Sequence, residues 1–237
     1  MKKSVYILLI GLLLCGGVGA QDSTKVSFLT GFDLVNRYVW RGAQFSDSPN
    51  LQPYMSVGFG GFSLMGWGSY AMGKNYAEID LFLSYNLKGV TLSVNDYFNE
   101  QDTALWTTNW REWDRAYTGH LVEAQLSYTT SGENHPLTLT ASTLIYGADL
   151  DDAGEQRYST YFEASYPFSV KDYELSITAG GTVTSDGFYS SHAGLVNVGV
   201  QAVRDIKVND NFSIPLSLSL VYNPENDDSF MVLMLSF

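Results

Sequence analysis

Residues that could carry out catalysis or bind a metal are few in this sequence, and they do not cluster. The three histidines, His120, His135 and His192, have no serine or carboxylate at the spacing of a known catalytic motif. Cys15 is the only cysteine, and a metal site needs several such ligands close together. We therefore expect no metal and no cofactor, and an enzyme is the least favoured class.

Charged and polar residues at alternating positions are more informative. Arg37 and Arg41 lie four residues apart in a predicted strand, so they share one face and could pair with Glu78 or Asp80. Such pairs could fill an enclosed interior with salt bridges, or form a constriction that orients a passing solute, with cations favoured because carboxylates outnumber arginines. The residues that we expect to face this interior are Asp33, Arg37, Arg41, Glu78, Asp80, Glu123, Gln125, Tyr161 and Glu163.

The elements that must position these residues are strands, because the dominant pattern is an alternation of apolar and polar residues. Between Glu78 and Leu87, for example, Ile79, Leu81, Leu83 and Tyr85 alternate with more polar positions. Strands of about ten residues suit a tilted crossing of a bilayer. We predict twelve strands, at 26–40, 51–59, 62–72, 76–87, 90–99, 119–129, 137–146, 157–167, 172–184, 194–205, 211–222 and 229–237.

The connections between these strands alternate in length. Short turns such as Gly60-Gly61 and Lys88-Gly89 follow even-numbered strands, whereas several longer connections, among them 41–50 and 100–118, follow odd-numbered ones. This alternation is typical of a transmembrane up-and-down antiparallel β-barrel with tight periplasmic turns and longer outer loops. After residue 20, no run approaches the 18 apolar residues of a helical span.

Composition separates this prediction from its alternative, a soluble β-sandwich or lipocalin-like barrel. Aromatic residues make up 14% of the chain, and charged residues make up 16%, against about 25% in typical soluble domains. Many aromatic side chains fall at predicted strand ends, where a membrane barrel has its interfacial girdles. The net charge of −12 argues against a nucleic-acid partner, which requires a basic patch.

The last predicted strand, 229–237, reads SFMVLMLSF. On the barrel interpretation, Met231, Leu233, Leu235 and Phe237 face lipid, and the strand pairs with the first one to close the sheet. Closure matters because an open edge in hydrocarbon leaves backbone N–H and C=O groups unsatisfied. A final phenylalanine after alternate apolar residues resembles the signature by which outer-membrane barrels engage the barrel assembly machinery, so Phe237 is the residue expected to be recognised.

Residues 1–20 have the features of a cleaved secretory signal peptide: Lys2 and Lys3, an apolar stretch from Val5 to Leu14, and Val18 and Ala20 before the expected cut. A lipoprotein anchored at Cys15 is a weaker alternative, because Leu14 stands where a small residue is needed. The expected organisation is thus one barrel domain, 21–237, exported to the outer membrane of a Gram-negative bacterium, with membrane lipid and lipopolysaccharide as partners.

Four short motifs follow one another between residues 31 and 87. They are Tyr38-Val39-Trp40-Arg41-Gly42, Pro49 with Gln52, Trp67-Gly68-Ser69, and Glu78-Ile79-Asp80-Leu81 followed by Tyr85. Their order and spacing resemble the TorF-type porin family, also described as the Gcw_chp family of bacterial proteins of unknown function. The resemblance covers about a quarter of the chain. It implies an outer-membrane barrel and supplies no substrate.

Two features do not follow the simple alternation. Asp96 falls on the apolar face of its strand, which indicates either a strand end or a bulge. Segment 103–117 is rich in tryptophan, and Trp106, Trp110, Trp113 and Tyr117 have helical spacing. We consider the three tryptophans candidates for a lid in the mouth of the barrel; packing against the rim or lying on the outer leaflet are the alternatives.

Together these patterns predict an outer-membrane porin or channel for passive diffusion of small solutes. The alternative is a barrel with a filled lumen that serves as a surface structural or interaction protein through its outer loops. The solute itself is not predicted by the sequence.

Overall fold

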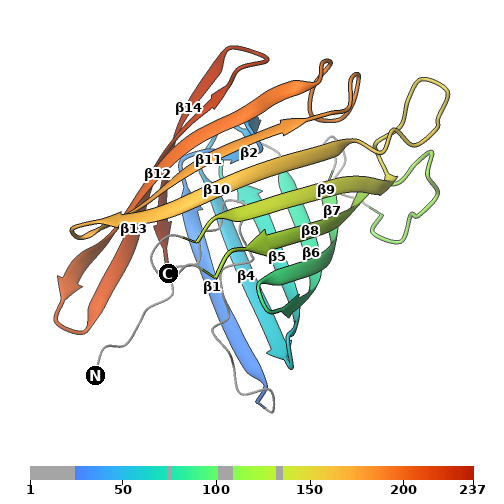
Figure 1. Ribbon diagram of the computed structural model, residues 1–237. Coiled ribbons are helices and arrows are strands. Elements are labelled where there is room, and N and C mark those ends of the chain that lie inside the picture. The colour runs from blue at the N-terminus through green and yellow to red at the C-terminus, as the bar shows by residue number, and fades with distance from the viewer. Residues whose placement is uncertain (1–24, 74–75, 101–108, 132–135) are drawn as a thin grey trace.

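The computed structural model describes residues 25–73, 76–131 without 101–108, and 136–237. The predicted signal peptide and Trp106 lie outside these residues. Twelve strands form a closed antiparallel barrel, and two further strands pair only with each other (Figure 1). The barrel strands are β1 (Ser27–Val35), β4 (Asn50–Phe59), β5 (Phe62–Ala71), β6 (Ala77–Leu87), β7 (Val90–Glu100), β8 (His120–Thr129), β9 (Thr138–Gly147), β10 (Thr160–Val170), β11 (Tyr173–Thr182), β12 (Gly194–Asn209), β13 (Phe212–Asn223) and β14 (Asp228–Ser236).

Neighbouring strands are connected by tight turns at one end of the barrel and by longer segments at the other. At the short-turn end, Lys88 and Gly89 both have positive φ, 51° and 84°, and so do Gly60 and Gly61. Two such residues in succession form the hairpin turn whose twist matches that of the flanking strands. We call the opposite end the long-loop end; it carries the connections 36–49, 148–159 and 183–193.

The barrel is polar inside and apolar outside. On β7, Leu92 is 57% exposed on the outer wall, whereas Asn95 on the lumen side is 4% exposed. The same contrast runs along the other strands, so most exposed large apolar side chains lie on the outer wall and buried Ser, Thr, Asn and Gln lie within. Such an outer surface requires an apolar surrounding, and a closed sheet in hydrocarbon leaves no backbone edge unpaired. The predicted transmembrane barrel of twelve strands is confirmed.

No helix among the described residues is long and apolar enough to cross a membrane.

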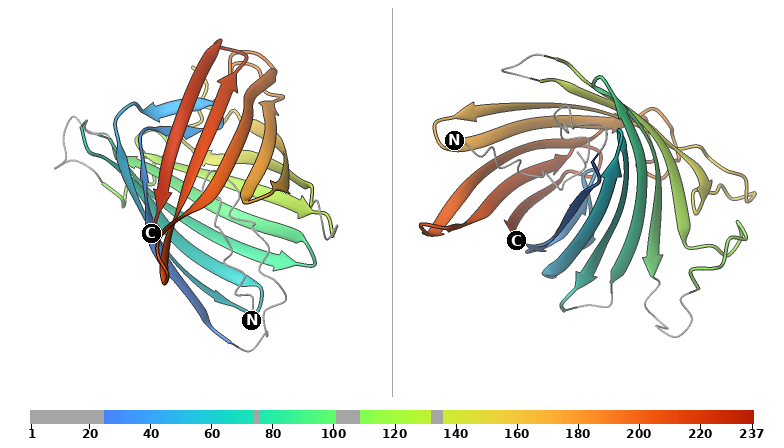
Figure 2. Two further views of the ribbon diagram at one scale, coloured as in Figure 1. Left: turned by 90° about the vertical axis from the view of Figure 1, so that its left-hand side faces the viewer. Right: turned by 90° about the horizontal axis from the view of Figure 1, so that it is seen from below.

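The barrel closes where β14 pairs with β1, as predicted for the last strand (Figure 2). The seam between β1 and β14 is short and runs from Asp33↔Ser236 to Val35↔Met234. On its other side, β1 pairs with β4 over its whole length, from Ser27↔Gly58 to Val35↔Asn50. Phe32 and Phe237 extend the seam by exchanging backbone hydrogen bonds of 3.1 and 2.9 Å, and their rings stack at 4.9 Å.

The first predicted strand, 26–40, is wrong beyond Val35, because the chain leaves the barrel wall there. The backbone N–H of Asn36 still donates to Leu233 C=O at 3.1 Å, and the Asn36 side chain extends the ladder: its Oδ1 accepts from Leu233 N–H at 2.9 Å, and its Nδ2 donates to Met231 C=O at 3.2 Å. The chain then forms β2 (Tyr38–Trp40) and β3 (Ala43–Ser46), a separate antiparallel pair. Segment 41–50 is therefore not an outer loop, as predicted, but part of a hairpin that enters the lumen.

Candidate functional site

The candidate site is the inward hairpin, residues 38–46, together with the lumen residues that it contacts. The hairpin is rooted between β1 and β4, and its tip is fastened to β8, which lies close to the opposite side of the ring of strands. A hairpin held in this way must cross the lumen.

Aromatic packing supports the hairpin inside the barrel. The Trp40 ring lies 5.1 Å from Tyr97 of β7 and 5.8 Å from Phe45 of the hairpin itself. Trp40 and Tyr97 form a buried cluster with Leu121 and Leu144 of the barrel wall. The alternation of the strands places these four side chains on the lumen side, so the barrel has a small apolar core within an otherwise polar interior.

The tip of the hairpin requires glycine at position 42. Gly42 has φ of +79°, and a Cβ added there would lie 1.8 Å from the carbonyl oxygen of Val196 on β12. The Gly42 carbonyl accepts a hydrogen bond of 3.2 Å from Nδ2 of Asn223 on β13. The tip is thus seated directly on the backbone of the barrel wall, at a distance that no side chain would permit.

Arg41 forms a buried ion pair with Glu123 of β8. Its two terminal nitrogens contact the two carboxylate oxygens at 2.5 and 3.1 Å, and the two side chains are 1% and 0% exposed. Glu123 also accepts hydrogen bonds of 3.1 Å from Asn95 Nδ2 and from the Tyr97 hydroxyl. A buried charge is tolerated when it is paired and its remaining hydrogen-bonding capacity is used, and this carboxylate meets both conditions.

Aromatic rings enclose the same guanidinium group. Its central carbon lies 4.4 Å from the ring centre of Tyr161, 4.5 Å from that of Trp40 and 5.3 Å from that of Tyr189. The Tyr189 hydroxyl also hydrogen-bonds to Arg41 and, at 3.3 Å, to Glu123. A cation within about 6 Å of an aromatic face is attracted to it. We call Glu123, Tyr161 and Tyr189, which all lie outside the hairpin, the guanidinium cage.

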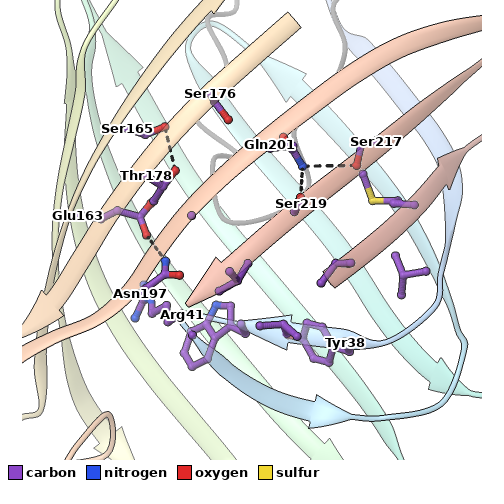
Figure 3. Close-up of a pocket in the computed structure, with 18 of the residues that line it drawn as sticks. Tyr38, Arg41, Glu163, Ser165, Ser176, Thr178, Asn197, Gln201, Ser217 and Ser219 are labelled. Atoms are coloured by element: carbon purple, nitrogen blue, oxygen red, sulfur yellow. Dashed lines mark hydrogen bonds between the residues drawn. The ribbon is translucent and has the colours of Figure 1, made fainter. Parts of the chain in front are cut away.

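A cavity of about 210 Å³ lies in the lumen beside the hairpin. Its two sides differ in chemistry (Figure 3): Tyr38 and Arg41 of the hairpin face it from one side, and hydroxyl and amide groups of β10 to β13 from the other. Gln201 Nε2 donates to Ser219 at 3.0 Å and to Ser217 at 3.4 Å on this polar wall. The polar wall comprises Ser165, Ser176, Thr178, Gln201, Ser217 and Ser219.

The structure places the predicted interior residues on the lumen side but pairs them differently. Arg41 contacts Glu123 and neither Glu78 nor Asp80, because the chain leaves the wall after Val35 and the hairpin carries Arg41 across the lumen. Glu78 instead accepts a hydrogen bond of 2.5 Å from the Tyr76 hydroxyl. The predicted residues that line the cavity are Arg37, Arg41, Asp80, Gln125 and Glu163, and those buried around it are Asp33, Glu78, Glu123 and Tyr161.

Several residues of the site were missed by the sequence reasoning, among them Asn95 and Tyr97 beside Glu123, the residues of the polar wall, Tyr189 and Asn223. Tyr189 belongs to the connection 183–193, and nothing in its local pattern indicates that it turns into the lumen. Asn223 ends β13, and its contact with Gly42 spans 181 positions. The Arg-Gly pair within the aromatic motif was the one available signal for a tight turn at this point.

The described part of the tryptophan-rich segment lies against the outer wall and not over the lumen. Trp110 packs 4.6 Å from Phe98, and Trp113, 45% exposed, stacks on His120 at 3.8 Å. The expected strand end or bulge at Asp96 is wrong, because β7 continues through it in unbroken register with β6; the outward carboxylate instead lies 2.9 Å from His120 Nδ1. The lid prediction is corrected for Trp110 and Trp113, because their partners project outward from β7 and β8; Trp106 lies outside the described residues.

No protein-family model and no curated protein matches this sequence. Among solved structures, the chain is similar to the crystal structure of an outer membrane channel from Pseudomonas putida F1, with 14% sequence identity and a TM-score of 0.42. The match covers 93% of this chain and 98% of that one. The evidence for a membrane barrel is therefore the closed strand pairing of this chain, with its apolar outer wall and polar lumen.

Proposed function

We propose that this protein is an outer-membrane channel for small polar solutes, and that the inward hairpin sets the width of its lumen. One observation carries the proposal: a hairpin rooted at β1 crosses the barrel to Glu123 and leaves a cavity of about 210 Å³, one wall of which presents hydroxyl and amide groups. A protein whose barrel served only as an anchor would have no need of an internal cavity with a polar wall, bounded by a fastened hairpin.

The short-turn end is placed in the periplasm and the long-loop end outside. This orientation is the one adopted by bacterial outer-membrane barrels, whose periplasmic turns are short. It puts the beginning of β1 and the end of β14 on the side from which an exported chain inserts. The resemblance of residues 31–87 to the TorF-type porin family is consistent with the same location, in contact with membrane lipid and lipopolysaccharide.

The charges around the cavity favour cations over anions. Asp80 and Glu163 line it together with Arg37 and Arg41, but the charge of Arg41 is already compensated by Glu123. The carboxylates that remain outnumber the arginines, and wherever they are ionised they give the lumen a negative potential, which attracts cations and repels anions.

Reconstitution tests this proposal directly. The purified protein, inserted into planar bilayers, is expected to give a small conductance that is larger for potassium with a bulky anion than for chloride with a bulky cation. In liposomes it is expected to admit small neutral solutes and to exclude larger ones in a graded series. A lumen that passes no ion and no solute under any condition would rule out a channel.

A filled barrel that acts at the cell surface is the second candidate. The observation that favours it is the buried cluster of Trp40, Tyr97, Leu121 and Leu144, which packs the hairpin against the wall in the way a permanent plug would be packed. Absent conductance in both the native protein and variants that release the hairpin would favour this function, with the outer loops as the interacting parts.

A further inference from the structure

The guanidinium cage is complete without the hairpin that occupies it. Glu123 comes from β8, Tyr161 from β10 and Tyr189 from the connection 183–193. Asn95 and Tyr97 hold the Glu123 carboxylate from the side, and they too belong to the barrel wall. The hairpin contributes the cation, Arg41, and one additional ring, that of Trp40.

The chemistry of the cage selects a planar or compact organic cation. A carboxylate that presents both oxygens matches the two parallel N–H groups of a guanidinium, and aromatic faces attract a poorly hydrated cation. A second carboxylate lies close by: Glu163 accepts a hydrogen bond of 2.7 Å from Tyr161 and one of 3.3 Å from Asn197. Aromatic faces add little for sodium or potassium, which keep their water, but much for an alkylguanidinium or alkylammonium group.

We propose that the cage is a binding site for the guanidinium or ammonium group of a solute, and that Arg41 is a tethered substitute for that group. A solute that enters the cavity approaches Arg41 and Glu163 from the lumen, because both line it. Displacement of Arg41 would free the tip of the hairpin from β8. This consequence for gating rests on the proposed channel, whereas binding in the cage does not.

The tether sets the concentration at which a solute can compete. An attached group at the end of a short connection acts at an effective concentration on the order of millimolar. The contacts of Gly42 with Asn223 and of Trp40 with Tyr97 also favour the occupied state. Wild-type protein should therefore respond only to millimolar or higher concentrations, whereas a protein without the Arg41 side chain should bind the same cation more tightly.

The decisive experiment measures binding of N-ethylguanidinium to the full protein in detergent by calorimetry, with neutral N-ethylurea as the matched probe. The variant is Arg41→Gly, because glycine accepts the φ of 48° found at this position. The matched control is Arg157→Gly, which removes the same charge from the connection 148–159, outside both the cage and the cavity lining. Far-UV circular dichroism establishes that each variant is folded.

We expect N-ethylguanidinium to bind Arg41→Gly, with N-ethylurea at least about tenfold weaker, as loss of a charge-assisted pair implies. Binding should disappear in Arg41→Gly/Glu123→Gln, and Arg157→Gly should behave as wild type. Equal affinity for the two probes, or binding that survives Glu123→Gln, overturns the proposal.

Wild-type protein provides a second test that requires no variant to fold. In planar bilayers, addition of N-ethylguanidinium at tens of millimolar should reversibly increase the potassium conductance. Addition of a sodium salt to the same ionic strength, or of N-ethylurea at the same concentration, should not produce this increase. Binding in the calorimeter without any conductance would refute the channel and leave the cage intact. Conductance without binding to either protein would refute the cage and leave the channel.

Discussion

Replacing Arg41 by glutamine is the most direct perturbation of the site. The substitution keeps a polar side chain of moderate length but removes the charge that compensates Glu123. The pair is fully buried, with exposures of 1% and 0%, so solvent does not screen it and the energetics of buried ion pairs apply. We therefore expect the hairpin to lose much of its attachment to β8.

The size of the effect follows from the environment of the remaining carboxylate. Removing one partner of a buried ion pair costs roughly 3–5 kcal/mol. Glu123 keeps its hydrogen bonds from Asn95, Tyr97 and Tyr189, so the lower end of that range, about 3 kcal/mol, is the appropriate figure. Since about 1.4 kcal/mol is a factor of ten, the ratio of released to seated hairpin should rise roughly 150-fold.

Single-channel recording is the assay, because a released hairpin widens the lumen. Arg41→Gln should show longer or more frequent high-conductance states, and Glu123→Gln should resemble it. The double variant should return toward wild type, because replacing both partners of a buried pair leaves no uncompensated charge. The control is Arg157→Gln; Arg157 lies in the connection 148–159, 4.0 Å from the exposed Asp152 and outside the cavity lining, and its loss should have little effect. If Arg41→Gln gives the wild-type conductance, or if the two single effects simply add, the ion pair does not hold the hairpin.

Three further changes test other parts of the structure. Gly42→Ala should also raise the conductance while the barrel stays folded, because the new Cβ would collide with the Val196 carbonyl; an unchanged conductance would show that the tip is not seated there. The contact of His192 with Glu225, 2.8 Å apart, raises the pKa of His192 above its usual 6.5 and lowers the pKa of Glu225. The charged contact should therefore persist to a higher pH than the usual histidine pKa would allow. It should weaken as pH rises through the raised histidine pKa and as pH falls through the lowered carboxyl pKa; a midpoint for His192 at or below 6.5 by NMR titration would contradict it. His120→Ala should release the stacked Trp113 indole on the outer wall and, through the lost hydrogen bonds, lower the free energy of unfolding by about 1–3 kcal/mol, with no change in conductance. An unshifted tryptophan emission spectrum would argue against this packing.

Most of the barrel could be predicted from the sequence because each strand carries its own evidence. In β6, the alternation of polar and apolar residues from Glu78 to Leu87 predicts the strand itself, and it separates the residues that face the lumen from those on the outer wall. The turn Lys88-Gly89 then marks its end, since a residue pair with positive φ is needed there. These signals are local, so they do not depend on contacts with distant parts of the chain.

The hairpin could not be predicted in this way. Tyr38-Val39-Trp40 continues the alternation of β1 and does form a strand, so the pattern gives no warning that the chain has left the wall. The departure depends on the Asn36 side chain, which extends the pairing with β14. The pairing of Arg41 with Glu123 spans 82 positions, and alternation specifies only the face of a residue, never its partner.

The position of the hairpin also explains how the shortest seam in the barrel is supported. β1 and β14 pair over few residues, because the chain turns inward after Val35 and cannot continue along β14. The bend that shortens the seam is the same bend that brings Asn36 onto Leu233 and sends Arg41 toward β8. Asn36 attaches the base of the hairpin to β14, and Arg41 attaches its tip to the far wall. The hairpin therefore links the two sides of the barrel through the lumen, and the contacts that narrow the lumen also compensate for the backbone pairing that is lost at the seam.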